Sequence, residues 1–286
     1  MKWAIPAKTF LLGEYAAIMG FPAFVLTTSP CFELSLSDDP GLHGIHPESP
    51  AGRWWLQQGF SDVGLQWHDP YQGRGGMGAS SAQFFGVYLA QHYLQKKTIC
   101  KTDMLDAYFQ SAWQGVGMRP SGYDVLAQSL HGCVYIDGQQ VKSQIYSWPF
   151  TTLAFILLHT GQKLATHHHL QALTLPGQVE QLAKIVESAK RAFELADSCH
   201  MINAVNAYHR QLLHMNLVAE RSFSQIQLLQ QHDDVLAVKG CGAMGADVLL
   251  LLTPKNRLES LTEHLSTMGW AILATSEALY EPCADE

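Results

Sequence analysis

A dense run of glycine and small residues, directly followed by a helical pattern, constrains this chain more than any other feature. The run is Gly73-Arg74-Gly75-Gly76-Met77-Gly78-Ala79-Ser80-Ser81-Ala82, and apolar residues then recur every three or four positions. Small residues let backbone N–H groups approach an anion closely, and the helix dipole adds positive potential at the helix N-terminus. We therefore expect a phosphate-binding loop here. A glycine-rich turn capped by serines is the alternative.

Known nucleotide-binding motifs fit the glycine-rich segments only in part. No Gly-Lys-Ser/Thr follows the first segment, so it is not a Walker A loop. The pattern Gly73-x-Gly75-x-x-Gly78 matches the dinucleotide fingerprint, but residues 67–72 before it do not have the pattern of a buried strand. Gly240-x-Gly242-x-x-Gly245 matches too, but strand-like residues 248–252 follow where that fold needs a helix. A NAD-dependent oxidoreductase is therefore a weak alternative.

Two further segments carry chemical information. Lys8 lies within the apolar, strand-like segment Pro6–Leu12, which Gly13 and Glu14 follow. A buried charge is costly unless it is paired, so Lys8 either points to solvent or has an acidic partner. The second segment, Lys239–Asp247, is a glycine loop between two strand-like stretches. Such a loop predicts close backbone approach to a ligand or to the loop at 73–78.

Together and in this order, the three segments resemble the three motifs of the galactokinase–homoserine kinase–mevalonate kinase–phosphomevalonate kinase (GHMP) superfamily. The first motif is matched by Pro6, Lys8, Gly13 and Glu14. The second is matched by 76–82, which is one residue longer, and the third by 239–246, where Met244 and Ala246 replace glycines. The resemblance spans nearly the whole chain.

Several details are most similar to the mevalonate-pathway branch of this superfamily. Pro120-Ser121-Gly122-Tyr123-Asp124 is similar to its Pro-Ser-Gly-x-Asp signature. The Gly-Glu-Tyr at 13–15, the segment 159–166 and Asp247 look more like phosphomevalonate kinases than mevalonate kinases. The resemblance implies an ATP-dependent kinase of isoprenoid biosynthesis that phosphorylates 5-phosphomevalonate. Mevalonate kinase and a non-catalytic nucleotide-binding homologue are the alternatives.

The resemblance also implies the fold and the domain boundaries. We expect an α+β, two-domain GHMP kinase fold, with a domain like ribosomal protein S5 domain 2 over 1–150 and a ferredoxin-like domain over 151–286. The sequence pattern agrees: strands over 2–36, loops with short strands at 37–75, a helix from 80 onward, further helices around 102–114 and at 124–130, and a hairpin at 133–146. Beyond Pro149, strands at 153–158, 235–238, 248–252 and 270–274 alternate with helices at 179–199, 201–215, around 228 and 258–268.

By the same resemblance, particular residues acquire roles. Asp124 would orient the acceptor oxygen or take its proton, and Lys8 would lie beside it and stabilise the transition state. ATP would be bound by Gly75, Gly76, Gly78, Ala79, Ser80 and Ser81, and Ser81 would also help to hold Mg²⁺. The acceptor would contact Glu14, Arg119, Ser121, Lys163, Gly242 and Ala243.

Three of these residues have a plainer alternative role. Asp124 could be an acid that stabilises a helix N-terminus. Arg119 and Lys163 are the candidates for binding a phosphate on the acceptor, but either could be a solvated surface residue. Trp113 and Gln114 occupy the region where mevalonate kinases carry a Glu that binds Mg²⁺.

Composition limits the kinds of partner. The formal net charge of -7 argues against non-specific nucleic-acid binding, which needs basic surface. The apolar runs are too short to cross a bilayer, and the six scattered cysteines are typical of reduced thiols in a cytoplasmic protein. We therefore expect a small-molecule substrate, no nucleic acid, no membrane, and a possible homodimer.

Overall fold

The computed structural model describes residues 1–60, 62–161 and 177–281, and two sheets lie in different halves of this chain. The first sheet has the order β3-β4-β2-β5-β6, with β1 also paired to β2. Its strands are β1 (Lys2–Leu12), β2 (Ala23–Ser37), β3 (Gly41–His43), β4 (Gly64–His68), β5 (Cys133–Asp137) and β6 (Lys142–Tyr146). The second sheet has the order β10-β7-β9-β8. Its strands are β7 (Leu153–His159), β8 (Ala237–Cys241), β9 (Val248–Pro254) and β10 (Ala271–Thr275).

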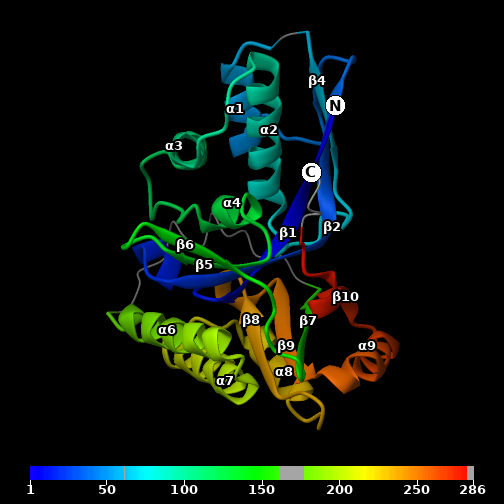
Figure 1. The fold of residues 1–286 in the computed structure, drawn as a ribbon. Helices are drawn as coiled ribbons and strands as arrows, with labels where there is room; N and C mark the ends of the chain where they lie inside the picture. Colours follow the sequence, from blue (N-terminus) through cyan, green and yellow to red (C-terminus); the bar gives the residue numbers. More distant parts are fainter. Residues whose placement is uncertain (61, 162–176, 282–286) are drawn as a thin grey trace.

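Helices cover both sheets (Figure 1). They are α1 (Pro50–Gln57), α2 (Ala79–Gln95), α3 (Lys101–Ala112), α4 (Tyr123–Gln128), α6 (Val179–Leu195), α7 (Ser198–His214), α8 (Glu220–Leu229) and α9 (Leu258–Thr267). Helices α2 and α4 pack on β1 and β2, whereas α8 and α9 contact the second sheet. Helix α6 contacts β2, and α7 contacts both β1 and β8, so this pair joins the two halves.

One apolar core runs through both halves. Its buried members include Ile5 and Phe24 of the first sheet, Phe193 of α6 and Leu250 of β9. The rings of Phe24 and Phe193 stack with their centroids 4.5 Å apart. Burial of apolar surface is the main favourable term in folding, so this shared core stabilises the contact between the sheets. The change of sheet falls between Tyr146 and Leu153, next to the expected boundary at 150/151, which stays a prediction.

The sequence-based segments agree with the structure in type, with three corrections. Helix α1 lies within 37–75, where only loops and short strands were expected, and its start signals are Ser49, which accepts a hydrogen bond from Gly52 N, and Pro50 at the first position. The expected helix 179–199 ends at Leu195, because Ala196 is left-handed and the Asp197 carboxylate caps α7. Residues 67–68 end a strand, β4, which pairs antiparallel with β2 and parallel with the short β3; the antiparallel pairing is unlike the parallel sheet of the dinucleotide fold and further weakens that alternative. Across the described residues, we find no helix with the length and apolarity needed to cross a membrane.

Candidate active site

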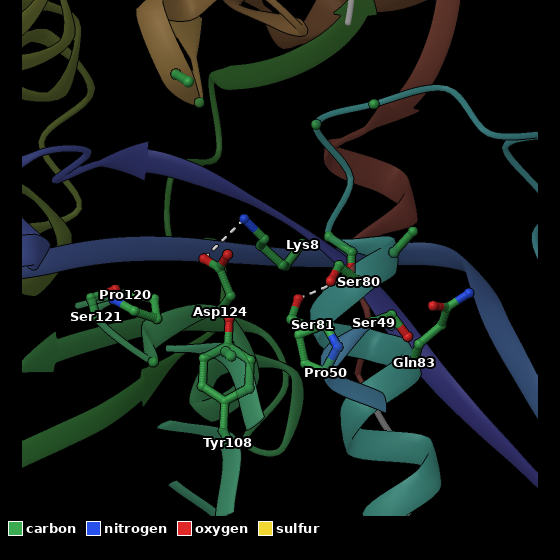
Figure 2. A pocket seen from close by; sticks show the side chains of 18 of the residues that line it. Lys8, Ser49, Pro50, Ser80, Ser81, Gln83, Tyr108, Pro120, Ser121 and Asp124 are labelled. Carbon is green, nitrogen blue, oxygen red and sulfur yellow. Dashed lines mark hydrogen bonds and ion pairs between the residues drawn. The ribbon is translucent and has the colours of Figure 1, made fainter. Parts of the chain in front are cut away.

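A cavity of about 850 Å³ brings together segments that are far apart in the sequence. Its walls come from β1, the glycine-rich loop before α2, the segment between α3 and α4, and the loop between β8 and β9. Figure 2 shows the side chains of Lys8 and Asp124 meeting opposite the first turn of α2, where Ser80 and Ser81 lie. The volume is in the usual range for small-molecule sites.

Lys8 and Asp124, which both line this cavity, form an ion pair. Lys8 Nζ lies 2.9 Å from Asp124 Oδ1. Lys8 is only 8% exposed, so it does not point to solvent. Of the two possibilities that the sequence left open for Lys8, the structure shows the acidic partner, which is Asp124. Tyr108 lies on the other side of Asp124 (Figure 2), and its pKa is raised by burial and, secondarily, by the Asp124 charge.

The backbone of the glycine-rich loop packs tightly against β1. Lys8 N donates a hydrogen bond to Met77 O over 2.9 Å. Gly78 is left-handed, with φ of 79°, and a Cβ there would lie 2.7 Å from Lys8 Cγ. Only glycine therefore lets the loop pass over the stem of Lys8. All six expected ATP-binding residues line the cavity: Gly75, Gly76, Gly78, Ala79, Ser80 and Ser81.

The loop between β8 and β9 lies against the first glycine-rich loop, which is one of the two possibilities that the sequence left open. A Cβ on Gly76 would lie 2.9 Å from Asp247 Cβ, at the end of the loop between β8 and β9. Where β8 leads into this loop, the backbone of Gly240 lies close to that of Gly245. A Cβ on Gly240 would lie 2.5 Å from Gly245 Cα, so a larger residue does not fit there. Met244, which replaces a glycine of the motif, still adopts a left-handed conformation with φ of 54°. The expected acceptor contacts Gly242 and Ala243 both line the cavity.

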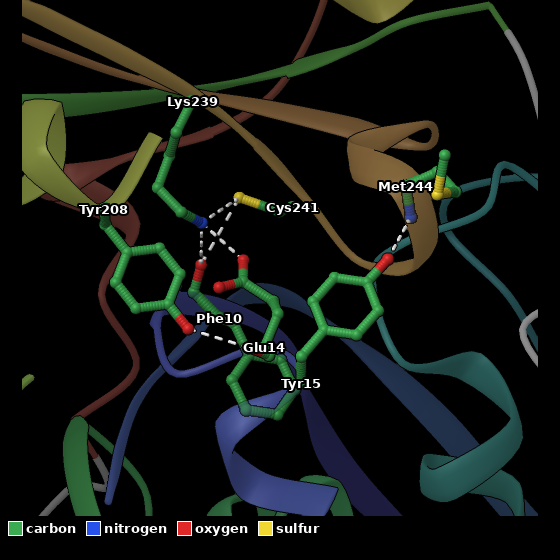
Figure 3. A network of polar contacts seen from close by, with 7 residues as sticks. All are labelled: Phe10, Glu14, Tyr15, Tyr208, Lys239, Cys241 and Met244. Carbon is green, nitrogen blue, oxygen red and sulfur yellow. Dashed lines mark hydrogen bonds and ion pairs between the residues drawn. The ribbon is translucent and has the colours of Figure 1, made fainter. Parts of the chain in front are cut away.

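Glu14 takes part in a buried polar network that ties the two halves together (Figure 3). Its carboxylate pairs with the ammonium group of Lys239, and the two side chains are 5% and 0% exposed. The hydroxyl of Tyr208 donates to Glu14 O over 2.7 Å, and Met244 N donates to the hydroxyl of Tyr15 over 2.7 Å. Glu14 lines the cavity, as expected, and its carboxylate is paired with Lys239.

The structure does not bring all the expected acceptor residues to the cavity. Ser121 lines it, and Ser121 Oγ accepts a hydrogen bond from Tyr123 N. Arg119 does not line it, because its guanidinium stacks over the Phe109 ring, 4.3 Å from the centroid. Such cation–π contact at an exposed position stabilises the side chain where it is. Lys163 lies outside the described residues.

Two arginines that the sequence analysis did not single out line the cavity instead. Arg74 belongs to the glycine-rich run and has no acidic partner within 4.0 Å among the described residues. Arg53 of α1 lies 4.0 Å from Glu48, and Arg53 Nη1 donates to Ser111 O. The position of Arg74 inside a phosphate-loop motif was a signal that could have identified it. Arg53 could not be found, because the helix that carries it was not expected.

The described residues contain no group of three or more His, Cys, Asp or Glu side chains that could hold a metal by themselves. Trp113 and Gln114 line the cavity and supply no carboxylate. Ser81 Oγ donates its proton to Gly78 O over 2.9 Å, which leaves the oxygen lone pairs available to a cation. Mg²⁺ commonly keeps several waters and uses one or two protein oxygens together with substrate phosphates, and Ser81 fits that need.

Comparison with known proteins finds matches to this fold among solved structures but none in sequence. No family model matches the chain, and no curated protein matches it in sequence. Solved structures do match over nearly its whole length. The phosphomevalonate kinase of Streptococcus pneumoniae, in complex with phosphomevalonate and AMPPNP, superposes with a TM-score of 0.79 and 15% identity, covering 96% of this chain and 99% of that one.

Two further kinases of known structure also superpose on this chain. The mevalonate kinase of Methanococcus jannaschii has a TM-score of 0.75 and 12% identity, covering 98% of both chains. The chain has the GHMP kinase fold. The galactokinase of Lactococcus lactis, complexed with galactose, also matches this GHMP kinase fold, with a TM-score of 0.72 and 11% identity over 95% of this chain and 92% of that one. The expected α+β fold class is thereby confirmed, whereas chemistry must be argued from the cavity.

Proposed function

We propose that this protein is an ATP-dependent small-molecule kinase of the mevalonate pathway, with 5-phosphomevalonate as its acceptor. The observation that carries the proposal is the Lys8–Asp124 ion pair, at 2.9 Å, facing a glycine-rich helix N-terminus in one cavity. An anion-binding loop, a carboxylate and an ammonium group are the parts that phosphoryl transfer requires. The GHMP kinase fold supports the same reading.

In this proposal, each part has one task. The backbone N–H groups of 75–81 bind the nucleotide phosphates. Asp124 orients the acceptor oxygen, which attacks the γ-phosphorus while the bond to the ADP oxygen breaks. Lys8 stabilises the negative charge on the transferred group. If the acceptor is an alcohol, Asp124 also takes its proton; a phosphate acceptor at neutral pH needs no such step.

Mg²⁺ is the cofactor that this chemistry calls for. Ser81 would hold it together with the nucleotide phosphates, and when bound it neutralises phosphate charge. Trp113 and Gln114 supply no carboxylate, so the Glu that binds Mg²⁺ in mevalonate kinases has no counterpart at these positions. We therefore expect Mg²⁺ to bind with the nucleotide and only weakly without it.

The identity of the acceptor depends on which cation meets its phosphate. Arg119, one of the two expected candidates, is held outside the cavity by Phe109, which weakens the case for a phosphorylated acceptor. Arg74 lies on the cavity wall without an acidic partner among the described residues and replaces Arg119 in the proposal. Mevalonate kinase, with the same chemistry on a neutral alcohol, is the second candidate for this reason.

A coupled assay of ADP release with Mg-ATP tests the proposal, with mevalonate and 5-phosphomevalonate in parallel wells. Turnover of 5-phosphomevalonate alone supports it. Turnover of mevalonate alone keeps the mechanism and replaces the acceptor. If the protein binds Mg-ATP and turns over neither acceptor, it has a different acceptor or is a non-catalytic relative, and the proposed reaction is wrong.

A further inference from the structure

We propose that Gln128, a residue with no expected role, positions the catalytic machinery by joining its three parts through one side-chain amide. Gln128 is fully buried at the end of α4, one helical turn after Asp124. Its Nε2 donates to Pro6 O over 2.8 Å and to Gly78 O over 3.3 Å. The side-chain NH₂ group of Gln128 therefore joins three elements: the helix that carries Asp124, the strand that carries Lys8, and the phosphate loop.

The first acceptor, Pro6 O, lies where β1 departs from regular pairing. The register of β1 against β2 shifts between Ile5 and Ala7, directly before Lys8. A buried carbonyl that has left the strand ladder needs another donor, and Gln128 supplies it. The hydrogen bond thus stabilises the irregular backbone that leads into Lys8.

The second acceptor, Gly78 O, controls the direction of a donor on the phosphate loop. It already accepts hydrogen bonds from Ser81 Oγ and Ala82 N, both at 2.9 Å, and Gln128 adds a third. In a trans peptide the C=O and the following N–H point in opposite directions. Because Gly78 O is held toward the interior, Ala79 N–H is directed away from it, and Ala79 lines the cavity.

The same logic holds for the preceding peptide. Met77 O accepts a hydrogen bond from Lys8 N, so Gly78 N–H points away from β1. In the described part of the chain, neither Gly78 N–H nor Ala79 N–H has a hydrogen-bond acceptor. Lys8 and Gln128 therefore hold two free donors in a fixed orientation on the cavity wall, which suits an anion.

The amide orientation of Gln128 follows from its neighbours. Two carbonyl oxygens face one end of the amide, and only the NH₂ end can donate to both. The other end, Oε1, is buried without a hydrogen-bond partner. A buried polar atom without a hydrogen-bond partner lowers the stability of the folded state. Stability alone therefore does not explain Gln128, whereas a role in holding the two carbonyl groups does.

The test uses Gln128→Met, which keeps the length and volume of the side chain and removes the donor. The matched control is Gln91→Met. Gln91 is also buried, and its amide donates to Gln58 Oε1 and Gln95 Oε1, but it lies toward the other end of α2. Circular dichroism and thermal melting establish that both variants fold.

Hydrogen–deuterium exchange of ligand-free protein is the first readout. We expect faster exchange at 6–10 and 76–82 in Gln128→Met and wild-type exchange there in Gln91→Met. This measurement does not depend on any reaction. Wild-type exchange at both segments in Gln128→Met overturns the inference.

Kinetics are the second readout, and this part rests on the proposed function. We expect kcat to fall about 10–100-fold in Gln128→Met, because small displacements of reacting groups have effects of that size, with a weaker affinity for Mg-AMPPNP. A merely structural role would lower the active fraction and leave KM and nucleotide affinity unchanged, which contradicts the inference. If wild-type protein turns over neither acceptor, the proposed function fails, while exchange still decides whether Gln128 holds the loop.

Discussion

Glu14 and Lys239, 225 residues apart in the sequence, form an ion pair that is almost completely removed from solvent. Glu14 follows the end of β1 and Lys239 lies on β8, so the pair connects the strand of Lys8 with the strand that leads into the cavity-lining loop between β8 and β9. Lys239 Nζ also lies 3.4 Å from Phe10 O and from Cys241 Sγ. The geometry of the cavity therefore depends on an ion pair between the two halves of the chain.

Breaking this pair will destabilise the protein. Lys239→Met leaves the Glu14 carboxylate buried without a counter-charge, which costs about 3–5 kcal/mol. The double variant Glu14→Gln/Lys239→Met should recover part of that loss, because no unpaired charge remains. Urea unfolding measures both. The control Lys2→Met removes an exposed ion pair with Glu33 and should change the free energy of unfolding by about 0–1 kcal/mol. Equal losses in Lys239→Met and Lys2→Met would contradict the prediction.

Asp124→Asn tests the proposed catalytic carboxylate. The amide keeps the shape of the side chain but can neither take a proton nor pair with the ammonium of Lys8 as a charge. We expect kcat to fall about 10²–10⁴-fold, as for a general base, while Mg-AMPPNP still binds. The exposed Asp233→Asn is the control. Wild-type turnover in Asp124→Asn would remove Asp124 from the mechanism.

Gly78→Ala separates steric contact from backbone strain. The new Cβ would lie 2.7 Å from Lys8 Cγ, so the lysine must move away from Asp124, and we expect kcat to fall more than about 10-fold. Gly59→Ala is matched to it, since Gly59 also has a positive φ, 74°, but has open space around it. Both variants should lose about 1–3 kcal/mol of stability from the left-handed backbone. Steady-state kinetics distinguishes them, and similar activity in both would argue against the contact.

Arg74→Met and Arg119→Met test which arginine meets a phosphate. Loss of a charged hydrogen bond costs about 1.5–3 kcal/mol, so kcat/KM should fall roughly 10–100-fold in Arg74→Met. Arg119→Met should remain close to wild type, because Arg119 stacks on Phe109 outside the cavity. The opposite ranking would restore Arg119 to the site.

Stability should fall in mild acid because of His209. Burial, with Lys239 and Arg210 nearby, lowers the pKa of His209 from 6.5 to about 4. Between these values the unfolded chain binds the proton and the folded chain does not, so lowering the pH from 6.5 toward 4 favours unfolding. In urea titrations over this range, His209→Gln should lose less stability than wild type. Identical pH dependence in both proteins would show that His209 is not responsible.

Much of the site was predictable because its elements are local. The run 73–82 specifies a left-handed turn and a helix start through adjacent glycines and serines, and the structure has both. Strands at β7 and β9 follow from continuous apolar stretches. Helix α1 was missed although Ser49 and Pro50 are start signals, because Asp, Pro, Gly and His occur at high density over 37–75 and this composition is typical of loops.

The partners of charged side chains were decided by the tertiary structure. Neighbouring residues determine backbone preferences, but a salt bridge depends on the register of distant strands and the packing of whole helices. The sequence left open whether Lys8 points to solvent or is paired, and only the packing of α4 against β1 brought Asp124 to it. Packing likewise determined that the charge of Glu14 is balanced by Lys239. The stacking of Arg119 on Phe109 was also decided by packing. Gln128 forms hydrogen bonds with Pro6 and Gly78, which are 122 and 50 residues away in the sequence, because α4 lies against β1 and the phosphate loop.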